Sequence, residues 1–153
     1  MINLLKKFKG KKIIITGHTG FKGSWLTLWL IHLGANVTGI SDKIPTNPSN
    51  FVANKLEKKI NHLTFNIKDK KKLSNVINKI KPDYIFHLAA QSLVKKSYTN
   101  PVETFETNSM GTLNLLEALK QFKLRKKCSV VIITSDKSYK NLEIKRGYKE
   151  NDI

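Results

Sequence analysis

Residues 11–23 read KKIIITGHTGFKG, a short β-branched run that passes directly into a loop with three glycines. The run from Lys11 to Thr16 predicts a buried strand, because consecutive isoleucines suit a sheet that is covered on both faces. The segment from Thr19 to Leu33 then carries apolar residues at helical spacing, and Gly34 is a natural helix stop. A strand, a glycine loop and a helix in this order are typical of a turn that binds dinucleotides.

The three glycines follow a G-x-x-G-x-x-G spacing, and each has a physical role in such a turn. Gly17 permits the tight turn, Gly20 lets the backbone approach a pyrophosphate, and Gly23 lets the helix pack closely on the strand. The amides at the start of the helix would face the phosphates, with the positive end of the helix dipole behind them. The alternative is an ordinary glycine-rich turn. The expected cofactor-binding residues of this loop are Gly17, Thr19, Gly20, Phe21 and Gly23.

Asp42 lies 19 residues after Gly23, where the second expected strand ends. A carboxylate at this place accepts hydrogen bonds from the adenosine ribose, which favours NAD over its 2′-phosphorylated form. Lys43 beside it could instead attract that phosphate, and Asp42 could also serve only to form a turn. We expect NAD as the cofactor, with Asp42 as its ribose ligand.

Strands and helices alternate along the rest of the chain. Short β-branched or aromatic runs predict four more strands, and apolar residues at helical spacing predict two more helices. This alternation favours an α/β fold, a Rossmann-like parallel sheet with helices on both faces that are joined by right-handed crossovers. The further expected strands are residues 35–40, 62–66, 83–88 and 129–134, and the further expected helices are residues 70–80 and 101–119.

The chain has 153 residues and a formal net charge of +17, with 28 Lys and Arg against 11 Asp and Glu. A charge of this size suggests nucleic acid as a partner. Only Arg125 and Arg146 are arginines, so 26 of the 28 basic residues are lysines, whereas base readout and bidentate phosphate contacts favour arginine. We therefore expect solvated, lysine-rich faces and no nucleic-acid partner.

Composition also limits which class of protein and which cellular location can be expected. At 40% hydrophobic and 25% charged residues, the chain has a globular composition and the length of one domain with a core. No apolar run approaches the ~18 residues of a membrane span, and residues 1–10 lack the features of a secretory signal. Cys128 is the only cysteine, which excludes an internal disulfide and argues against a cysteine metal site. We expect a cytoplasmic protein with no membrane partner, and Cys128 as an inert residue that opens a buried strand.

Other side chains have an expected place in the fold but no expected chemistry. His18 is expected to face solvent in the glycine loop, and His87 to be a packed, hydrogen-bonded core residue at the end of a strand. Trp25 and Trp29 are one helical turn apart and are expected to anchor the core. The apolar side chains among the lysines of residues 1–9 are expected to pack on the domain, with a small membrane-surface helix as the alternative.

Longer stretches of the sequence resemble a known family, the bacterial CDP-glucose 4,6-dehydratases, which are extended short-chain dehydrogenases/reductases that act on nucleotide sugars. The resemblance begins with FKGKKIIITGHTGFKGSWLTLWL at residues 8–30 and reaches GYKEND at residues 147–152. The glycine loop and the His-Leu-Ala-Ala stretch at residues 87–90 are shared by all extended members. The strings HTGFKGSW at residues 18–25 and Ser-Asp-Lys at residues 135–137 are more particular to this branch.

The resemblance implies a reaction and three catalytic residues. Bound NAD would take hydride from sugar C4, water would leave across C5 and C6, and the hydride would return to C6. Asp136 would protonate the departing hydroxyl, Lys137 would act as the base at C5, and Ser135 would hydrogen-bond the sugar near O4. An Asp-Lys pair taken alone could instead be a surface ion pair in a turn.

The resemblance also implies further cofactor contacts. The family usually has Asp in place of Asn66, and this departure weakens one polar contact. Leu88, Ala89 and Ala90 are expected to line the ribose and nicotinamide side of the cofactor. Asn66 and Ile67 are expected near the adenine. Asn108, on a neighbouring helix, is expected to help organise the site.

The family's Tyr-x-x-x-Lys pair is expected beyond Ile153, together with the last strands of the sheet and the substrate domain. We therefore expect residues 1–153 to be the N-terminal, dinucleotide-binding part of a homodimeric enzyme that acts on CDP-glucose. By itself this part is expected to be inactive, with a sheet edge and apolar helix faces uncovered. The alternatives are a nucleotide-sugar 4-epimerase of the same superfamily, against which Asp136 and Lys137 count, and a non-catalytic NAD-binding module.

Overall fold

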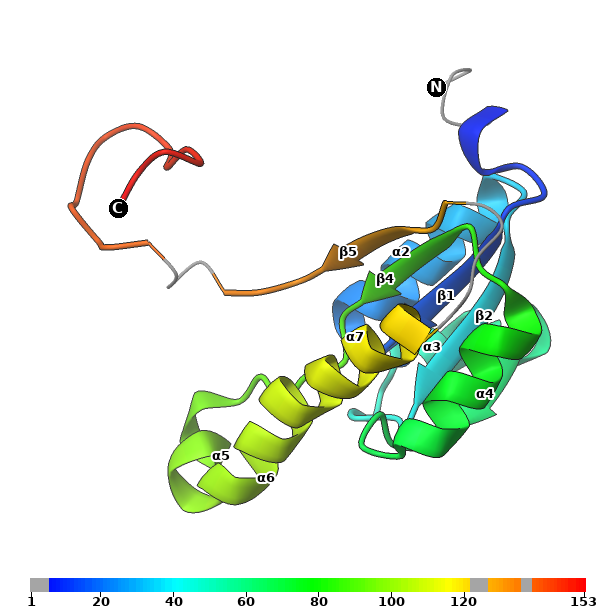
Figure 1. Cartoon of the computed structure of the whole chain (residues 1–153), viewed down its shortest axis with the longest axis horizontal. Coiled ribbons are helices and arrows are strands. Elements are labelled where there is room, and N and C mark those ends of the chain that lie inside the picture. The colour runs from blue at the N-terminus through cyan, green and yellow to red at the C-terminus, as the bar shows by residue number, and fades with distance from the viewer. Residues whose placement is uncertain (1–5, 122–126, 136–138) are drawn as a thin grey trace.

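The computed structural model describes residues 6–121, 127–135 and 139–153. Five parallel strands form one sheet in the order β3-β2-β1-β4-β5 (Figure 1). All five expected strands are present, so the predicted Rossmann-like parallel sheet is confirmed. The strands are β1 (Lys12–Thr16), β2 (Asn36–Ser41), β3 (Asn61–Thr64), β4 (Tyr84–His87) and β5 (Ser129–Ile132).

The order of the strands reverses at β1. From β1 the chain moves outward through β2 to β3, crosses back to β4 on the other side of β1, and continues to β5. The register places Thr16, the last residue of β1, beside Ile40 of β2 and His87 of β4. The connections that follow β1 and β4 therefore leave in opposite directions, and open α/β sheets bind their ligands at such a switch point.

Helices cover both faces of the sheet, as the alternating pattern predicts. α2 and α3 lie on one face, and α4 and α7 pack side by side on the other (Figure 1). The short helices α3 and α5 were not expected from the sequence, whereas α4 matches its prediction. The helices are α2 (Phe21–His32), α3 (Asn50–Ala53), α4 (Lys70–Ile80), α5 (Val94–Thr99), α6 (Pro101–Phe105) and α7 (Gly111–Gln121), with a 3-10 turn η1 (Leu56–Lys58) and a π-helical turn η2 (Glu106–Met110).

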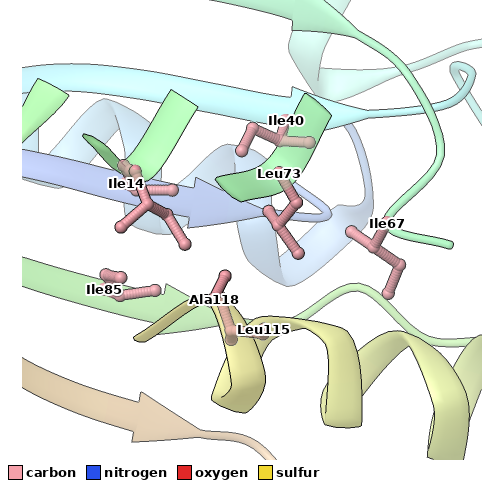
Figure 2. Close-up of a cluster of buried hydrophobic side chains, with 8 residues drawn as sticks. Ile14, Ile40, Ile67, Leu73, Ile85, Leu115 and Ala118 are labelled. Atoms are coloured by element: carbon pink, nitrogen blue, oxygen red, sulfur yellow. The ribbon is translucent and has the colours of Figure 1, made fainter. Parts of the chain in front are cut away.

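Neighbouring residues of β1 point to opposite faces of the sheet and join two separate cores. Ile14 lies in the core beneath α4 and α7, with Leu73 and Leu115 (Figure 2). Ile13 and Ile15 lie in the core beneath α2. All three isoleucines are fully buried, and burial of each stabilises the fold by about 1.5–3 kcal/mol. The isoleucine run is therefore a strand that is covered on both faces, as the sequence predicts.

α2 approaches the sheet through small side chains and not through its tryptophans. Trp25 and Trp29 are each 52% exposed, so the expectation that they anchor the core is wrong. The reason is that the face of α2 that meets the sheet carries small residues, which let the helix lie close to β1, and the tryptophans fall on its outer side. The buried residues of α2 are Gly23, Ser24, Thr27 and Leu30.

The segment expected as one helix over residues 101–119 is continuous but changes its geometry part-way. α6 passes into the π-helical turn η2, and α7 begins at Gly111. Gly111 packs against Ile67, and a Cβ at Gly111 would overlap the end of that side chain. Asn108 lies within η2, and π-helical turns are frequent at functional sites.

β5 is the edge strand of the described sheet. Val130 and Val131 are 36% and 42% exposed, and Cys128 before them is only partly buried. The expectation of a buried fifth strand that opens with Cys128 is therefore wrong for the described residues. The physical reason is that β5 pairs only with β4 in the described part of the chain, and so its outer side stays open.

The lead-in to β1 packs on the domain through Phe8. This side chain is 9% exposed, and its ring meets the ring of Tyr84 edge-on, with 5.2 Å between the centroids. The expected packing of the N-terminal segment is confirmed for Phe8, whereas residues 1–5 lie outside the described residues.

Candidate functional site

The loops that follow β1 and β4 touch at the carboxyl edge of the sheet. Gly17 has a φ of +74°, in the left-handed region that favours glycine. A Cβ at Gly17 would lie 2.8 Å from the Ala89 amide nitrogen and 2.9 Å from the Leu88 carbonyl carbon. Only a residue without a side chain fits between these loops, which explains the first glycine of the motif.

The other two glycines shape the start of α2. The Gly20 amide donates to the Gly17 carbonyl oxygen over 3.1 Å, and a Cβ at Gly23 would overlap that same oxygen. The first turn of α2 therefore lies directly against the loop. The amides of Phe21 and Lys22 have no acceptor among the described residues, as is usual at the start of a helix. Together with the positive end of the helix dipole, they form a cradle suited to an anion.

The end of β2 holds the glycine loop in place. The Thr19 hydroxyl donates to the Lys43 carbonyl oxygen over 2.7 Å, and the Thr19 amide donates to Ser41 Oγ over 3.4 Å. Thr19 is only 5% exposed, and its side chain braces the loop from within.

Asp42 and Asn66 meet at the ends of two neighbouring strands. Asn66 Nδ2 donates to Asp42 Oδ2 over 3.3 Å, and the Lys68 amide donates to Asn66 Oδ1 over 2.9 Å. Asp42 is exposed at the edge of the sheet where the glycine loop lies. Ile67, which the resemblance places near an adenine, is 3% exposed, and its side chain packs in the core beneath α4 and α7.

A chain of hydrogen bonds joins β1, β4 and the helix that contains Asn108. His87 Nδ1 lies 2.7 Å from Thr16 Oγ1, and His87 Nε2 lies 3.0 Å from Thr112 Oγ1. The Thr112 hydroxyl donates its one hydrogen to the Asn108 carbonyl oxygen over 2.7 Å, so Thr112 accepts from His87. His87 therefore donates from Nε2, and in the neutral ring its Nδ1 accepts from the Thr16 hydroxyl.

The same chain of hydrogen bonds fixes both ends of the loop after β4. Thr16 Oγ1 accepts from the Ala89 amide over 3.2 Å. Asn108 Oδ1 accepts from the Gln91 amide over 2.7 Å, and Asn108 Nδ2 donates to the Gln91 carbonyl oxygen over 3.0 Å. Ala89, Ala90 and Gln91 are thus held between β1 and η2, beside the glycine loop.

His87 is 2% exposed, and burial lowers its pKa to about 4. Burial therefore keeps the ring neutral at neutral pH, and the hydrogen bonds at both of its nitrogens are compatible with that state. The expectation that His87 is a packed, hydrogen-bonded core residue is confirmed.

His18 is fully buried, so the expectation that it faces solvent is wrong. Its ring lies over Gly39 of β2, where a Cβ would overlap the ring, and its Nε2 lies 2.7 Å from His62 Nδ1. Burial lowers the pKa of His18 to about 4, the Ile40 carbonyl opposes this shift, and the nearby His62 adds to it. The space above Gly39 is the physical reason that the ring turns inward.

The residues expected to be catalytic follow β5. The Ile133 amide donates to the His87 carbonyl oxygen over 3.0 Å, which keeps the chain after β5 alongside the end of β4. Ser135 lies two residues further on and is exposed. Asp136 and Lys137 lie outside the described residues.

Sequence reasoning assigned no role to four polar residues that brace these loops. A strand-terminal Thr directly before the glycine loop, and a Thr four residues after Asn108 on the same helix, were signals that could have been used. The other two show no pattern in the sequence, because their partners lie in the glycine loop, more than 20 residues away along the chain. The four residues are Thr16, Ser41, His62 and Thr112.

Two negative findings hold for the described residues. Their His, Cys, Asp and Glu side chains form no group of three that could hold a metal ion. Among the same residues, the length and apolar content of every helix fall short of what a bilayer crossing requires.

Comparison with known proteins agrees with this architecture. Residues 14–152 match the protein family described as GDP-mannose 4,6 dehydratase. The chain belongs to this family. A curated relative, the CDP-glucose 4,6-dehydratase of Salmonella typhimurium, is 49% identical over 145 residues, which cover 95% of this chain and 40% of that protein. The resemblance to the sugar-nucleotide dehydratases seen in the sequence is thus confirmed.

Solved structures give the same fold. An epimerase of Methanothermobacter thermautotrophicus matches 98% of this chain and 43% of its own, with a TM-score of 0.77 and 28% identity. The UDP-glucose 4-epimerase of Thermus thermophilus, solved in complex with NAD, matches 72% of this chain and 34% of its own, with a TM-score of 0.64 and 30% identity. The chain spans between 21% and 40% of the length of the curated relatives it matches.

Proposed function

We propose that this chain is the dinucleotide-binding part of an enzyme that dehydrates CDP-glucose to CDP-4-keto-6-deoxyglucose. The observation that carries the proposal is the 49% identity to a CDP-glucose 4,6-dehydratase over 95% of the chain. The Ser-Asp-Lys string at residues 135–137 adds support, because it begins three residues after β5, the strand that pairs with β4.

The residues at the switch point fit NAD. The closely packed glycine loop and the unpaired amides of Phe21 and Lys22 suit a pyrophosphate, which needs a close backbone approach and hydrogen-bond donors. Asp42 would accept from the adenosine ribose, with Asn66 holding its other side. Leu88, Ala89 and Ala90 would line the nicotinamide side, because Thr16 and Asn108 fix the loop that contains them. NAD, when bound, supplies a hydride acceptor that later returns the hydride.

The residues after β5 would handle the protons of the reaction. Asp136 would give a proton to the hydroxyl that leaves from C6, and Lys137 would remove the proton from C5. Lys137 must be neutral to act as a base, so its surroundings have to favour the uncharged amine. Ser135 would hold the sugar near O4 through its hydroxyl.

The parent enzyme would add the parts that residues 1–153 do not supply. The substrate domain and the Tyr-x-x-x-Lys pair would come from further along the parent polypeptide. Helices α6 and α7 would contribute to a homodimer, because they expose Val102, Phe105 and Leu113, which are 66%, 66% and 46% exposed. The proposed location is the cytoplasm, where the nucleotide-sugar substrate would be available.

A nucleotide-sugar 4-epimerase is the second candidate, and the structural likeness to two epimerases favours it. Epimerisation needs the hydride transfer but not the elimination of water. Asp136 and Lys137 would then be dispensable, and this difference separates the two functions.

The experiment expresses the parent protein, with the coding sequence that follows Ile153, and incubates it with CDP-glucose and NAD. We expect a product with the ultraviolet absorbance of a 4-keto-6-deoxy sugar in alkali. Asp136→Asn and Lys137→Ala should abolish it, whereas Lys140→Ala, just outside the string, should not. CDP-galactose as the product would establish the epimerase, and no turnover of a folded, NAD-binding protein would leave only a binding module.

A further inference from the structure

The glycine loop is contacted by His62, a histidine that belongs to none of the sequence motifs described above. His62 of β3 is 44 positions from His18 in the sequence, yet its Nδ1 lies 2.7 Å from His18 Nε2. The contact spans the width of β2, because Gly39 of β2 has no side chain to separate the two rings. The outer strand of the sheet thus contacts the loop that follows its central strand.

The hydrogen bonds around the two rings form one continuous chain. Ser41 Oγ accepts from the Thr19 amide over 3.4 Å and lies 3.2 Å from His18 Nδ1. At the other end, His62 Nε2 lies 3.2 Å from Thr64 Oγ1. A neutral pair satisfies every contact, because one ring donates at the central N–H···N bond and the other accepts.

The surroundings of the His18 ring disfavour an additional proton on it. Phe51 of α3 packs against both rings, with 5.2 Å from its ring centroid to each of the other two centroids. β2 presents Gly39 and the Ser41 hydroxyl. Among the described residues, His62 is the titratable group whose charge acts on His18. If both rings were doubly protonated, two N–H groups would face each other and the central bond would open.

We propose that His62 is a positioning residue for dinucleotide binding, because its hydrogen bond to His18 holds the glycine loop in the shape that receives the pyrophosphate. The inference rests on the proposed NAD site and adds a residue to it. His62 touches no part of that site itself. It acts through His18, whose neighbour Thr19 is held by the same chain of hydrogen bonds.

Two substitutions separate hydrogen bonding from simple packing. His62→Phe keeps a ring against Phe51 but removes the nitrogen, whereas His62→Asn removes the ring but keeps a polar atom near the position of Nδ1. If His62 only fills space, His62→Phe is the milder change. If it positions the loop, His62→Asn is the milder change.

The readouts are the dissociation constant for NAD, measured calorimetrically on the whole chain, and hydrogen exchange of the Thr19 amide. Loss of this one partly buried hydrogen bond predicts about three- to tenfold weaker NAD binding and faster Thr19 exchange in His62→Phe. The dissociation constant of His62→Asn for NAD should stay within about twofold of the wild-type value, because the variant keeps the hydrogen bond to His18. Equal behaviour of His62→Phe and wild type, or a larger loss in His62→Asn, would overturn the proposal.

A third measurement needs no variant. In ¹⁵N-labelled wild-type protein, a scalar coupling across the N–H···N bond should connect the His18 and His62 rings at neutral pH, and its absence would reject the pair. If wild-type protein does not bind NAD, the proposed function fails. The ring coupling and the Thr19 exchange then still decide whether His62 holds the loop.

Discussion

Thr16 Oγ1 lies 2.7 Å from His87 Nδ1, and this contact joins the carboxyl ends of the two strands that flank the switch point. His87 accepts at Nδ1, and Thr16 in turn accepts from the Ala89 amide. The backbone that would face the nicotinamide side of a dinucleotide is therefore held by a neutral, buried histidine. This arrangement leads to a prediction about pH.

The stability of the chain should fall as the pH is lowered from about 6.5 to about 4. An unfolded histidine binds a proton near pH 6.5, whereas burial keeps the folded pKa of His87 at about 4. The contribution of the neutral ring is thus complete above pH 6.5 and is lost as the pH falls, by up to about 3 kcal/mol. Urea unfolding across this range should show a shallower pH dependence in His87→Gln. A variant as steep as the wild type would contradict the assignment.

Gly17→Ala should destabilise the chain and abolish NAD binding. The new Cβ would press on the backbone of Leu88 and Ala89, which cannot move as a flexible side chain can. Gly10→Ala is a matched control, because Gly10 has a φ of +71° but has nothing within 4 Å of an added Cβ. Thermal melts should place the cost of Gly10→Ala at about 1 kcal/mol and that of Gly17→Ala well above it. Equal costs would mean that the two loops do not touch.

Asn108→Ala should loosen the loop after β4. The variant removes two hydrogen bonds, to the amide and the carbonyl of Gln91, and leaves both groups unpaired at a partly buried place. We expect a loss of about 1–3 kcal/mol in the free energy of unfolding and faster hydrogen exchange of the Gln91 amide. Asn78→Ala, at an exposed helix residue whose one side-chain bond is 3.5 Å long, should change neither by much. If the variant keeps the wild-type stability and the wild-type exchange rate of the Gln91 amide, Asn108 does not hold the loop after β4.

Asp42→Asn should narrow the preference for NAD over NADP. The carboxylate would repel a 2′-phosphate, and because Asp42 is exposed to water, removal of its charge is worth about 1 kcal/mol, or about fivefold in the ratio of dissociation constants. Asp152→Asn, in the C-terminal segment, makes the same change in net charge and should leave the ratio as it is. A ratio that moves equally in both variants would point to net charge alone.

Much of this fold could be predicted because local patterns determine it. The isoleucine run of β1, the glycine loop and the helical spacing of α4 each carry their signal within a few neighbouring residues. The errors concern residues whose place depends on distant partners. His18 turns inward because Gly39 leaves room for it, and Trp25 lies outside because small residues of α2 meet the sheet.

The candidate site divides in the same way. Gly17 and Gly23 could be predicted from spacing, whereas the bracing by Thr16, His62 and Thr112 depends on contacts between segments that are far apart in the sequence. The exposure of β5 could not be read from its apolar composition, because burial of a strand depends on what lies beside it.

The central claim is that the switch point between β1 and β4 binds NAD. The most direct measurement is a titration of the ¹⁵N-labelled chain with NAD, followed through its backbone amide shifts. The account predicts that the largest shifts fall on residues 17–23, on Asp42, on Asn66 and on residues 88–90. A folded chain whose amides do not shift, or whose shifts fall mainly on the lysine-rich faces, would contradict it.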